Sequence, residues 1–212
     1  MRIKNLVLLT SSLLISNQAV AQEIKLNMKE LACSETLIDN AAIMFRVEPD
    51  MSIKKAIEIG GPAYKDNKVE FEKALKTAYS EGLSSDDRNT RKIIESLYSE
   101  RSRLQCLTEG HEVLPRDEVE FCDLTGIVAN NIAIQRQVPT MGFSDVIEQR
   151  RKIVSIGFNK EVDDMYIRIA KDAFSILKPN LEVDAWSYIG RLYGDVKRLE
   201  CLDEAMNAKD DH

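Results

Sequence analysis

The chain has 212 residues, of which 29 are Lys or Arg and 35 are Asp or Glu, so its formal net charge is −6. This acidity argues against nucleic acid or anionic lipid as a partner, because neutralising phosphates requires clustered positive charge. With 44% hydrophobic and 30% charged residues, the composition is that of a globular protein and not of a disordered tail.

The first 21 residues have the pattern of a secretory signal peptide. Arg2 and Lys4 give a positive start, an apolar run covers residues 6–15, and residues 19–21 form the Ala-Val-Ala exit that signal peptidase recognises. A membrane anchor is the weaker interpretation, because the run is well short of the roughly 20 residues that cross a bilayer. We expect residues 1–21 to be removed, which takes the net charge from −6 to −8. The mature protein is then expected in the periplasm, or secreted, without insertion into the membrane.

The sequence contains an internal repeat. At a shift of 95 residues, segment 97–107 matches segment 192–202 at six of eleven positions. Two unrelated helical segments of this composition would share about one. Nearer the start the shift is 89, which aligns Cys33 with Cys122, and then 90, which aligns Pro49 with Pro139. The shift only grows along the chain, as a duplication with small insertions would produce.

The repeat also indicates how the cysteines pair. Cys33, Cys106, Cys122 and Cys201 are an even number in an exported chain, which predicts disulfides. Three pairings are possible, and a duplicated unit with one bridge requires Cys33 with Cys106 and Cys122 with Cys201. Each bridge closes a loop of roughly 70 to 80 residues, worth about 4.5 kcal/mol on a chain-entropy estimate. Free buried thiols and a zinc site are the alternatives, although no Cys-x-x-Cys spacing supports zinc.

Helical periodicity dominates both repeats. In the first, we expect one helix over about 29–47 and a second from a cap at Ser52 to Gly60. A third helix ends at Gly82, and a fourth begins after a cap at Ser84 or Ser85. In the second, the expected helices lie near residues 116–137, 144–156, 160–177 and 181–206, followed by a disordered tail over 207–212.

No segment shows the sustained alternation of apolar and polar residues that marks a strand. The predicted fold class is therefore all-α. We expect two duplicated four-helix units, residues 29–109 and 116–206, each with one internal disulfide and packed together.

The sequence offers few catalytic groups. The only histidines are His111, in the linker, and His212, so neither a Ser-His-Asp triad nor a His-rich metal site is expected. Asp86-Asp87 and Asp163-Asp164 could supply paired carboxylates, but they fall in first turns of predicted helices, where they favour the helix dipole. We therefore predict no catalytic, cofactor-binding or metal-binding residue.

Other conspicuous residues have structural interpretations. The basic run at 150–152 is expected on a solvated helix face, with contact to an acidic partner as the alternative. Trp186 is expected to pack in the core, and Tyr98 and Tyr193, which both repeats keep, are expected to be structural. Residues that both repeats keep report what the unit needs to fold. Function is therefore expected where they differ, in the insertion around 153–163 and on the exposed faces.

The pattern of a cysteine, an Ile- and Ala-rich helix, Pro-x-Met, and a final Leu-Tyr before Arg-Leu-x-Cys-Leu resembles small secreted two-cysteine helical domains of proteobacteria. It is similar to Rap1a/Tai-type immunity proteins, which neutralise type VI amidase effectors. The resemblance covers residues 31–202 as two copies, whereas such an immunity protein is a single domain. It carries over no binding residue.

The leading functional hypothesis is an exported, non-enzymatic protein that binds another protein. Export, a disulfide-stapled helical body, few catalytic residue types and an acidic surface favour an inhibitor or immunity factor against a cell-wall-directed toxin, with a secreted effector as partner. One alternative is a periplasmic stress chaperone that exposes apolar surface on acidification. The other is a carboxylate-dependent enzyme that acts on glycans.

Overall fold

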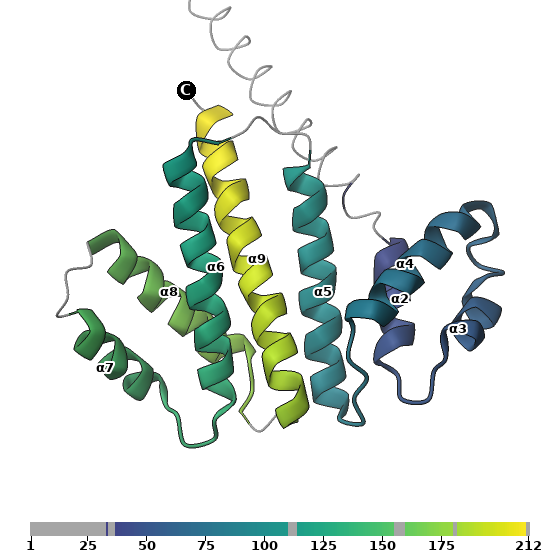
Figure 1. Ribbon diagram of the computed structural model, residues 1–212, viewed down its shortest axis with the longest axis horizontal. Coiled ribbons are helices and arrows are strands. Elements are labelled where there is room, and N and C mark those ends of the chain that lie inside the picture. The colour runs from purple at the N-terminus through teal and green to yellow at the C-terminus, as the bar shows by residue number, and fades with distance from the viewer. Residues whose placement is uncertain (1–32, 34–36, 110–113, 155–159, 180–181, 211–212) are drawn as a thin grey trace, which may run out of the picture. The chain divides into compact units, whose positions relative to one another are not determined.

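The computed structural model describes residues 33, 37–109, 114–154, 160–179 and 182–210. Within these ranges the protein is all-helical and has no strand, which confirms the predicted fold class at that level (Figure 1). The chain divides into two units, 1–35 and 36–212. Of the first unit only Cys33 is described, and it is helical and buried. The predicted signal peptide, His111 and His212 lie outside the described residues.

The second unit contains two successive sets of four helices. The first half comprises α2 (Leu37–Val47), α3 (Ile53–Gly60), α4 (Lys68–Glu81) and α5 (Arg88–Thr108), with a 3₁₀ turn η1 (Lys65–Asn67) before α4. The second half comprises α6 (Arg116–Gln137), α7 (Phe143–Val154), α8 (Lys160–Ile176) and α9 (Val183–Asp210).

Several helix ends lie where the sequence predicts them. Ser52 caps α3, because its hydroxyl accepts a hydrogen bond from the Lys55 N–H at 3.2 Å. Gly82 follows the end of α4, and a Cβ there would lie 2.6 Å from both the carbonyl oxygen of Ala78 and the Cγ of Arg46. Only glycine fits this close approach. The bounds of α6 are those predicted, 116–137.

The start of α5 corrects our prediction of a serine cap. The helix begins at Arg88, and its N-cap is Asp87, whose carboxylate accepts from the N–H of Thr90 at 2.6 Å and from its hydroxyl at 2.8 Å. These hydrogen bonds favour the charged carboxylate and lower the pKa of Asp87. Ser85 is buried instead, and its hydroxyl donates to the Glu182 carboxylate at 2.8 Å.

The C-terminal segment is a second correction. We expected disorder over 207–212, but α9 continues through Asp210, so the first four of those residues are helical. The remaining two lie outside the described part of the chain.

Each half uses the same pattern of helix contacts. The first helix of the half, α2 or α6, packs against the other three, and the second and third helices pack against each other. The fourth helix, α5 or α9, packs within its own half against the first helix. The halves meet where α5 packs against α9, which therefore lies between α5 and α6 (Figure 1).

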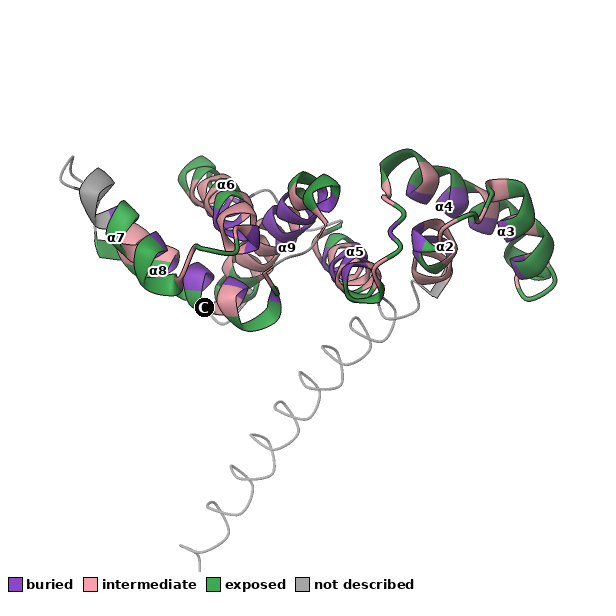
Figure 2. Ribbon diagram, turned by 90° about the horizontal axis from the view of Figure 1, so that it is seen from below, coloured by how far each residue is buried: buried purple, intermediate pink, exposed green. Residues whose placement is uncertain are grey.

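The core follows these contacts. Buried positions run along α9 and face both of its neighbours, whereas exposed positions dominate α3 (Figure 2). The largest side chains with under 2% exposure include Tyr193, Phe71, Ile43, Leu75, Ile94, Ile132, Ile189 and Leu192.

A disulfide joins α6 to α9. Cys122 and Cys201 are bonded across a Cα–Cα distance of 5.4 Å, which confirms that predicted pair. Cys33 and Cys106 are each in a disulfide, and none of the four cysteines is free. Beyond the bridge the two helices stay close at Gly126 and Gly194, where a Cβ on the second glycine would lie 2.8 Å from the carbonyl oxygen of the first. The partners run in opposite directions, so α6 and α9 are antiparallel.

Candidate functional site

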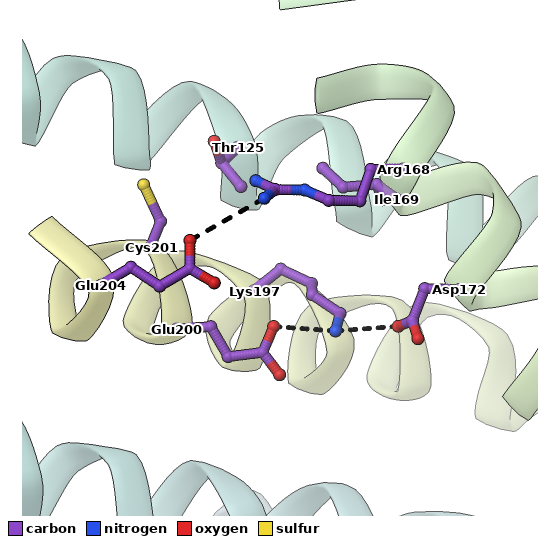
Figure 3. A pocket seen from close by; sticks show the side chains of 8 residues that line it. All are labelled: Thr125, Arg168, Ile169, Asp172, Lys197, Glu200, Cys201 and Glu204. Atoms are coloured by element: carbon purple, nitrogen blue, oxygen red, sulfur yellow. Dashed lines mark hydrogen bonds and ion pairs between the residues drawn. The ribbon is translucent and has the colours of Figure 1, made fainter. Parts of the chain in front are cut away.

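A hollow of about 210 Å³ lies between α6, α8 and α9, beside the Cys122–Cys201 bridge (Figure 3). We call it the charged hollow. Its lining residues are Thr125, Arg168, Ile169, Asp172, Lys197, Glu200, Cys201 and Glu204.

Helical spacing brings these side chains together. On α9, residues 197, 200, 201 and 204 are three or four apart and therefore share one face. On α8, residues 168, 169 and 172 do the same. Because α6 packs against both helices, the two faces converge beside Thr125, which is buried.

Lys197 is the central charge of the hollow. Its ammonium lies 2.8 Å from the Asp172 carboxylate and 2.8 Å from the Glu200 carboxylate, and its side chain is 16% exposed. Burial is the largest single influence on the pKa of Lys197 and acts to lower it. The hydrogen bonds and negative charges of Asp172 and Glu200 together outweigh burial, so the pKa is raised. The lysine is therefore held as an ammonium ion at neutral pH and is not available as a nucleophile.

Tyr193 extends the network into the core. Its hydroxyl donates to the Asp172 carboxylate at 2.8 Å, and the Lys197 ammonium lies 5.4 Å from its ring centroid. Burial, and then the hydrogen bond to Asp172, raise the pKa of the Tyr193 hydroxyl. Asp172 thus accepts from both a buried phenol and an ammonium group, which fixes its orientation.

The mouth of the hollow is held more loosely. Arg168 and Glu204 are 3.8 Å apart, and their side chains are 65% and 69% exposed. An ion pair this long and this exposed contributes little to stability. Figure 3 shows the pair bridging α8 and α9, separate from the Asp172–Lys197–Glu200 chain. Both charges can exchange partners without disturbing the buried network.

A shallower hollow of about 570 Å³ adjoins this one along α8 and shares Arg168 and Asp172 with it. It adds Ile167, which is 36% exposed, and the exposed Lys171. The two hollows give a charged surface with one exposed apolar side chain, that of Ile167.

Three of the four aspartates singled out in the sequence have structural partners. Asp163 forms an ion pair with Arg150, and Asp164 forms one with Lys160. Asp87 caps a helix, as described above. Each of these carboxylates therefore has a structural partner.

Arg150 corrects the expectation of a solvated basic run. It is 7% exposed, pairs with Asp163, and places its guanidinium 4.8 Å from the ring centroid of Tyr166. The tyrosines at 98 and 193 are both buried, as expected, and Trp186 is half-buried.

The sequence analysis did not identify Lys197 or Asp172. A signal was present, because the 95-residue shift aligns them with Ser102 and Thr77, which are uncharged. Charged residues in one repeat that align with uncharged residues in the other could have identified these two positions as candidate functional residues.

Among the described residues, no three His, Cys, Asp or Glu side chains gather as they would around a metal ion. The same part of the chain contains no helix that is long and apolar enough to span a membrane. Comparison with known proteins finds no matching family model, curated protein or solved structure.

Proposed function

We propose that this is an exported periplasmic protein that binds another protein, as an inhibitor or immunity factor against a cell-wall-directed toxin. The observation that carries the proposal is the charged hollow, where two exposed and weakly paired charges, Arg168 and Glu204, stand over a fixed ionic network. A partner can use these two charges without unfolding or rearranging what lies beneath them.

The chemistry of the hollow favours binding over catalysis. A general acid or base works best when its pKa lies near the operating pH. The pKa of Lys197 is instead raised above its ordinary value, and the carboxylates of Asp172 and Glu200 serve as its acceptors. The network therefore holds the ammonium charge of Lys197 in place.

We also propose that the two halves are copies of one four-helix unit, with Cys33 bonded to Cys106 as the repeat requires. Such a duplication supports the proposal of a binding protein, because differences between the copies indicate where function lies. The helix bounds keep the shifts found in the sequence. The ends of α2 and α6 and the starts of α3 and α7 are 90 residues apart. The ends of α4 and α8 and the starts of α5 and α9 are 95 residues apart.

Equivalent side chains also make equivalent contacts. The Arg46 guanidinium lies 5.4 Å from the ring centroid of Tyr79, and Arg136, 90 residues later, lies 4.6 Å from that of Phe174. The second position of each pair is separated by 95 residues, as the repeat predicts. Both contacts join the first helix of a half to its third.

Against this shared framework, the charged hollow is a difference between the copies. In the first half, Ser102 and Thr77 stand where Lys197 and Asp172 stand in the second. The fold of the unit does not require these charges, because one copy lacks them. Their presence in the other copy supports a role in function.

Export is supported by covalent chemistry. Disulfides form and persist mainly in oxidising compartments, and the Cys122–Cys201 bridge closes a loop of 79 residues. Together with the leader-like residues 1–21, the disulfides support a periplasmic location.

The test is charge reversal at the mouth of the hollow. Arg168→Glu and Glu204→Lys should each reduce recovery of the partner about tenfold in crosslinking mass spectrometry on native periplasm, because a lost ion pair is replaced by repulsion. The repeat supplies matched controls, since Lys73 and Glu109 occupy the aligned positions in the first half and are exposed. Lys73→Glu and Glu109→Lys should leave recovery unchanged.

Two results would contradict the proposal. One is that no stoichiometric protein partner is recovered with the wild-type chain. The other is that all four reversals weaken recovery equally, because this would assign the effect to net charge and not to the hollow.

A further inference from the structure

A second hollow, of about 220 Å³, lies between α5 and the C-terminal end of α8, where the first half meets the second. We call it the lysine-rimmed hollow. Its lining residues are Asn89, Lys92, Ile93, Ser96, Leu97, Ile176, Leu177 and Lys178.

The charge of this hollow is unusual for the molecule. The chain has more acidic than basic residues, 35 against 29, yet no carboxylate lines the hollow. Three other hollows among the described residues, between α6 and α9, at the charged hollow and along α8, each contain at least two. Lys92 and Lys178 are both exposed, and neither forms an ion pair with a described residue. Glu95, three residues after Lys92 on α5, is near enough for the charge of Lys92 to act on its pKa, but its carboxylate does not line the hollow. The hollow therefore presents two positive charges without a direct ion-pair partner.

The floor between these lysines is apolar. Leu97 and Leu177 are buried beneath it, at 6% and 2% exposure, and Ile176 remains 47% exposed at its edge. An apolar surface with a few convergent polar groups is the usual character of a small-molecule site. Here two of the polar groups, on Lys92 and Lys178, are cationic, and the other two, on Asn89 and Ser96, are uncharged.

The repeat explains why the hollow is open. At a shift of 95 residues, Ile93 and Ser96 align with Tyr188 and Arg191 of α9. At that position in the other half, the Arg191 guanidinium stacks 5.1 Å from the Tyr188 ring centroid, and Tyr188 is 6% exposed. The two side chains on α5 are smaller than the stacked pair at the aligned positions on α9, which accounts for the space beside them.

We propose that the lysine-rimmed hollow binds a single-chain carboxylate amphiphile, such as a medium-chain fatty acid. Its alkyl chain lies along Ile93, Leu97 and Ile176, and its carboxylate lies between Lys92 and Lys178. The hollow is small, about 220 Å³, which favours a medium-length chain over a long one. This site is separate from the charged hollow and does not depend on the function proposed for it.

Calorimetric titration of the full-length mature protein with octanoate tests the proposal. Binding should be at least about tenfold weaker for butyrate, because each buried methylene group contributes to affinity. The neutral analogue 1-octanol should bind more weakly than octanoate to the wild-type protein. It should bind equally to the wild type and to the variant Lys92→Gln/Lys178→Gln, since it has no charge for the lysines to neutralise.

The double variant Lys92→Gln/Lys178→Gln should bind octanoate about tenfold more weakly, since two exposed charge contacts are lost. The control is Lys54→Gln/Lys55→Gln on α3, which removes the same charge from exposed positions elsewhere and should bind as the wild type does. Equal octanoate affinity in the wild type and both double variants would overturn the proposal.

A third variant separates shape from charge. Ile93→Tyr/Ser96→Arg introduces the pair found at the filled position, and its helical circular dichroism should remain that of the wild type. If the hollow is the site, octanoate binding is lost although a positive charge has been added. Tighter binding would show that net charge alone attracts the ligand, and would overturn the assignment to the hollow.

Discussion

Tyr98 and Tyr193, which the repeat in the sequence aligns, have different surroundings in the two halves. Each is buried in the fourth helix of its half and each has a cation over its ring, Arg101 at 4.7 Å and Lys197 at 5.4 Å. Arg101 follows its tyrosine by three residues and Lys197 by four, so the two cations face different neighbours.

Arg101 is directed toward the seam between the halves. Its guanidinium pairs with Glu81 at 2.7 Å and approaches Asp195 of α9 at 3.5 Å. Lys197 instead pairs with Asp172 of its own half and forms the floor of the charged hollow. A buried tyrosine thus lies beside the contact between the halves in the first half and beside the charged hollow in the second.

The largest expected effect on stability comes from removing a disulfide from either half. Cys122→Ser/Cys201→Ser should lower the free energy of unfolding by about 4 kcal/mol, because the bridge closes a loop of 79 residues in the unfolded chain. Denaturant titration measures this loss. Cys33→Ser/Cys106→Ser should cost a similar amount if the halves are stapled alike. A much smaller loss for one pair would show that the halves rely on their bridges to different extents.

The next largest expected effect is a pH dependence of the free energy of unfolding, and it concerns Tyr188 at the seam between the halves. Burial, more than any other influence, raises the pKa of Tyr188 to about 12. Because the folded state holds this proton more tightly than the unfolded state, the stabilisation is complete below pH 10. It is lost as the pH rises from 10 to about 12, by about 2 kcal/mol.

Tyr188→Phe should flatten the fall in unfolding free energy over this pH range, as measured by denaturant titration together with tyrosinate absorbance. In this variant Tyr193, whose pKa is also raised, should still contribute to the fall in unfolding free energy at high pH. An unchanged pH dependence in Tyr188→Phe would contradict the assignment.

A smaller effect is expected at the charged hollow. Lys197→Met should lower the free energy of unfolding by about 1–2 kcal/mol, because Asp172 and Glu200 then face each other without a cation while remaining partly solvated. Ser102→Ala, at the aligned position, should change it by about 0.5 kcal/mol or less. Equal losses at the two positions would mean that the network is not particular to the second half.

The smallest expected effect concerns the contacts between an arginine and an aromatic ring at aligned positions of the two halves. Arg46→Ala and Arg136→Ala each remove a cation from an aromatic ring and should cost about 0.5–1 kcal/mol. Arg136→Ala should cost more, since the guanidinium also donates to the carbonyl oxygen of Leu177 at 2.9 Å. Thermal unfolding of both variants measures the difference. A larger loss from Arg46→Ala would contradict this ordering.

Much of the fold follows from local signals. The bounds of α6 and the ends marked by Ser52 and Gly82 were predictable because each depends on a few neighbouring residues. The cap of α5 was missed because residues 84–87, Ser-Ser-Asp-Asp, are all of a type that caps helices. Asp87 is the cap because its carboxylate accepts two hydrogen bonds from Thr90.

The sequence also contains features that favour the continuation of α9 beyond Met206. The residues after Met206 include Ala208 and Lys209, which favour helix, and no Gly or Pro follows to end it. The site was less accessible to such reasoning, because Lys197 meets Asp172 only when α8 lies beside α9. Arg150 was misjudged for the same reason, since its partner Asp163 belongs to another helix.

The position of α9 between α5 and α6 has a consequence for assembly during synthesis. A chain emerging from the N-terminus completes α5 and α6 long before α9 exists to cover them. Their apolar faces stay uncovered until residues 183–210 arrive. Truncation within α9 should therefore leave both earlier helices aggregation-prone, so that damage to the last helix spreads well beyond the residues removed.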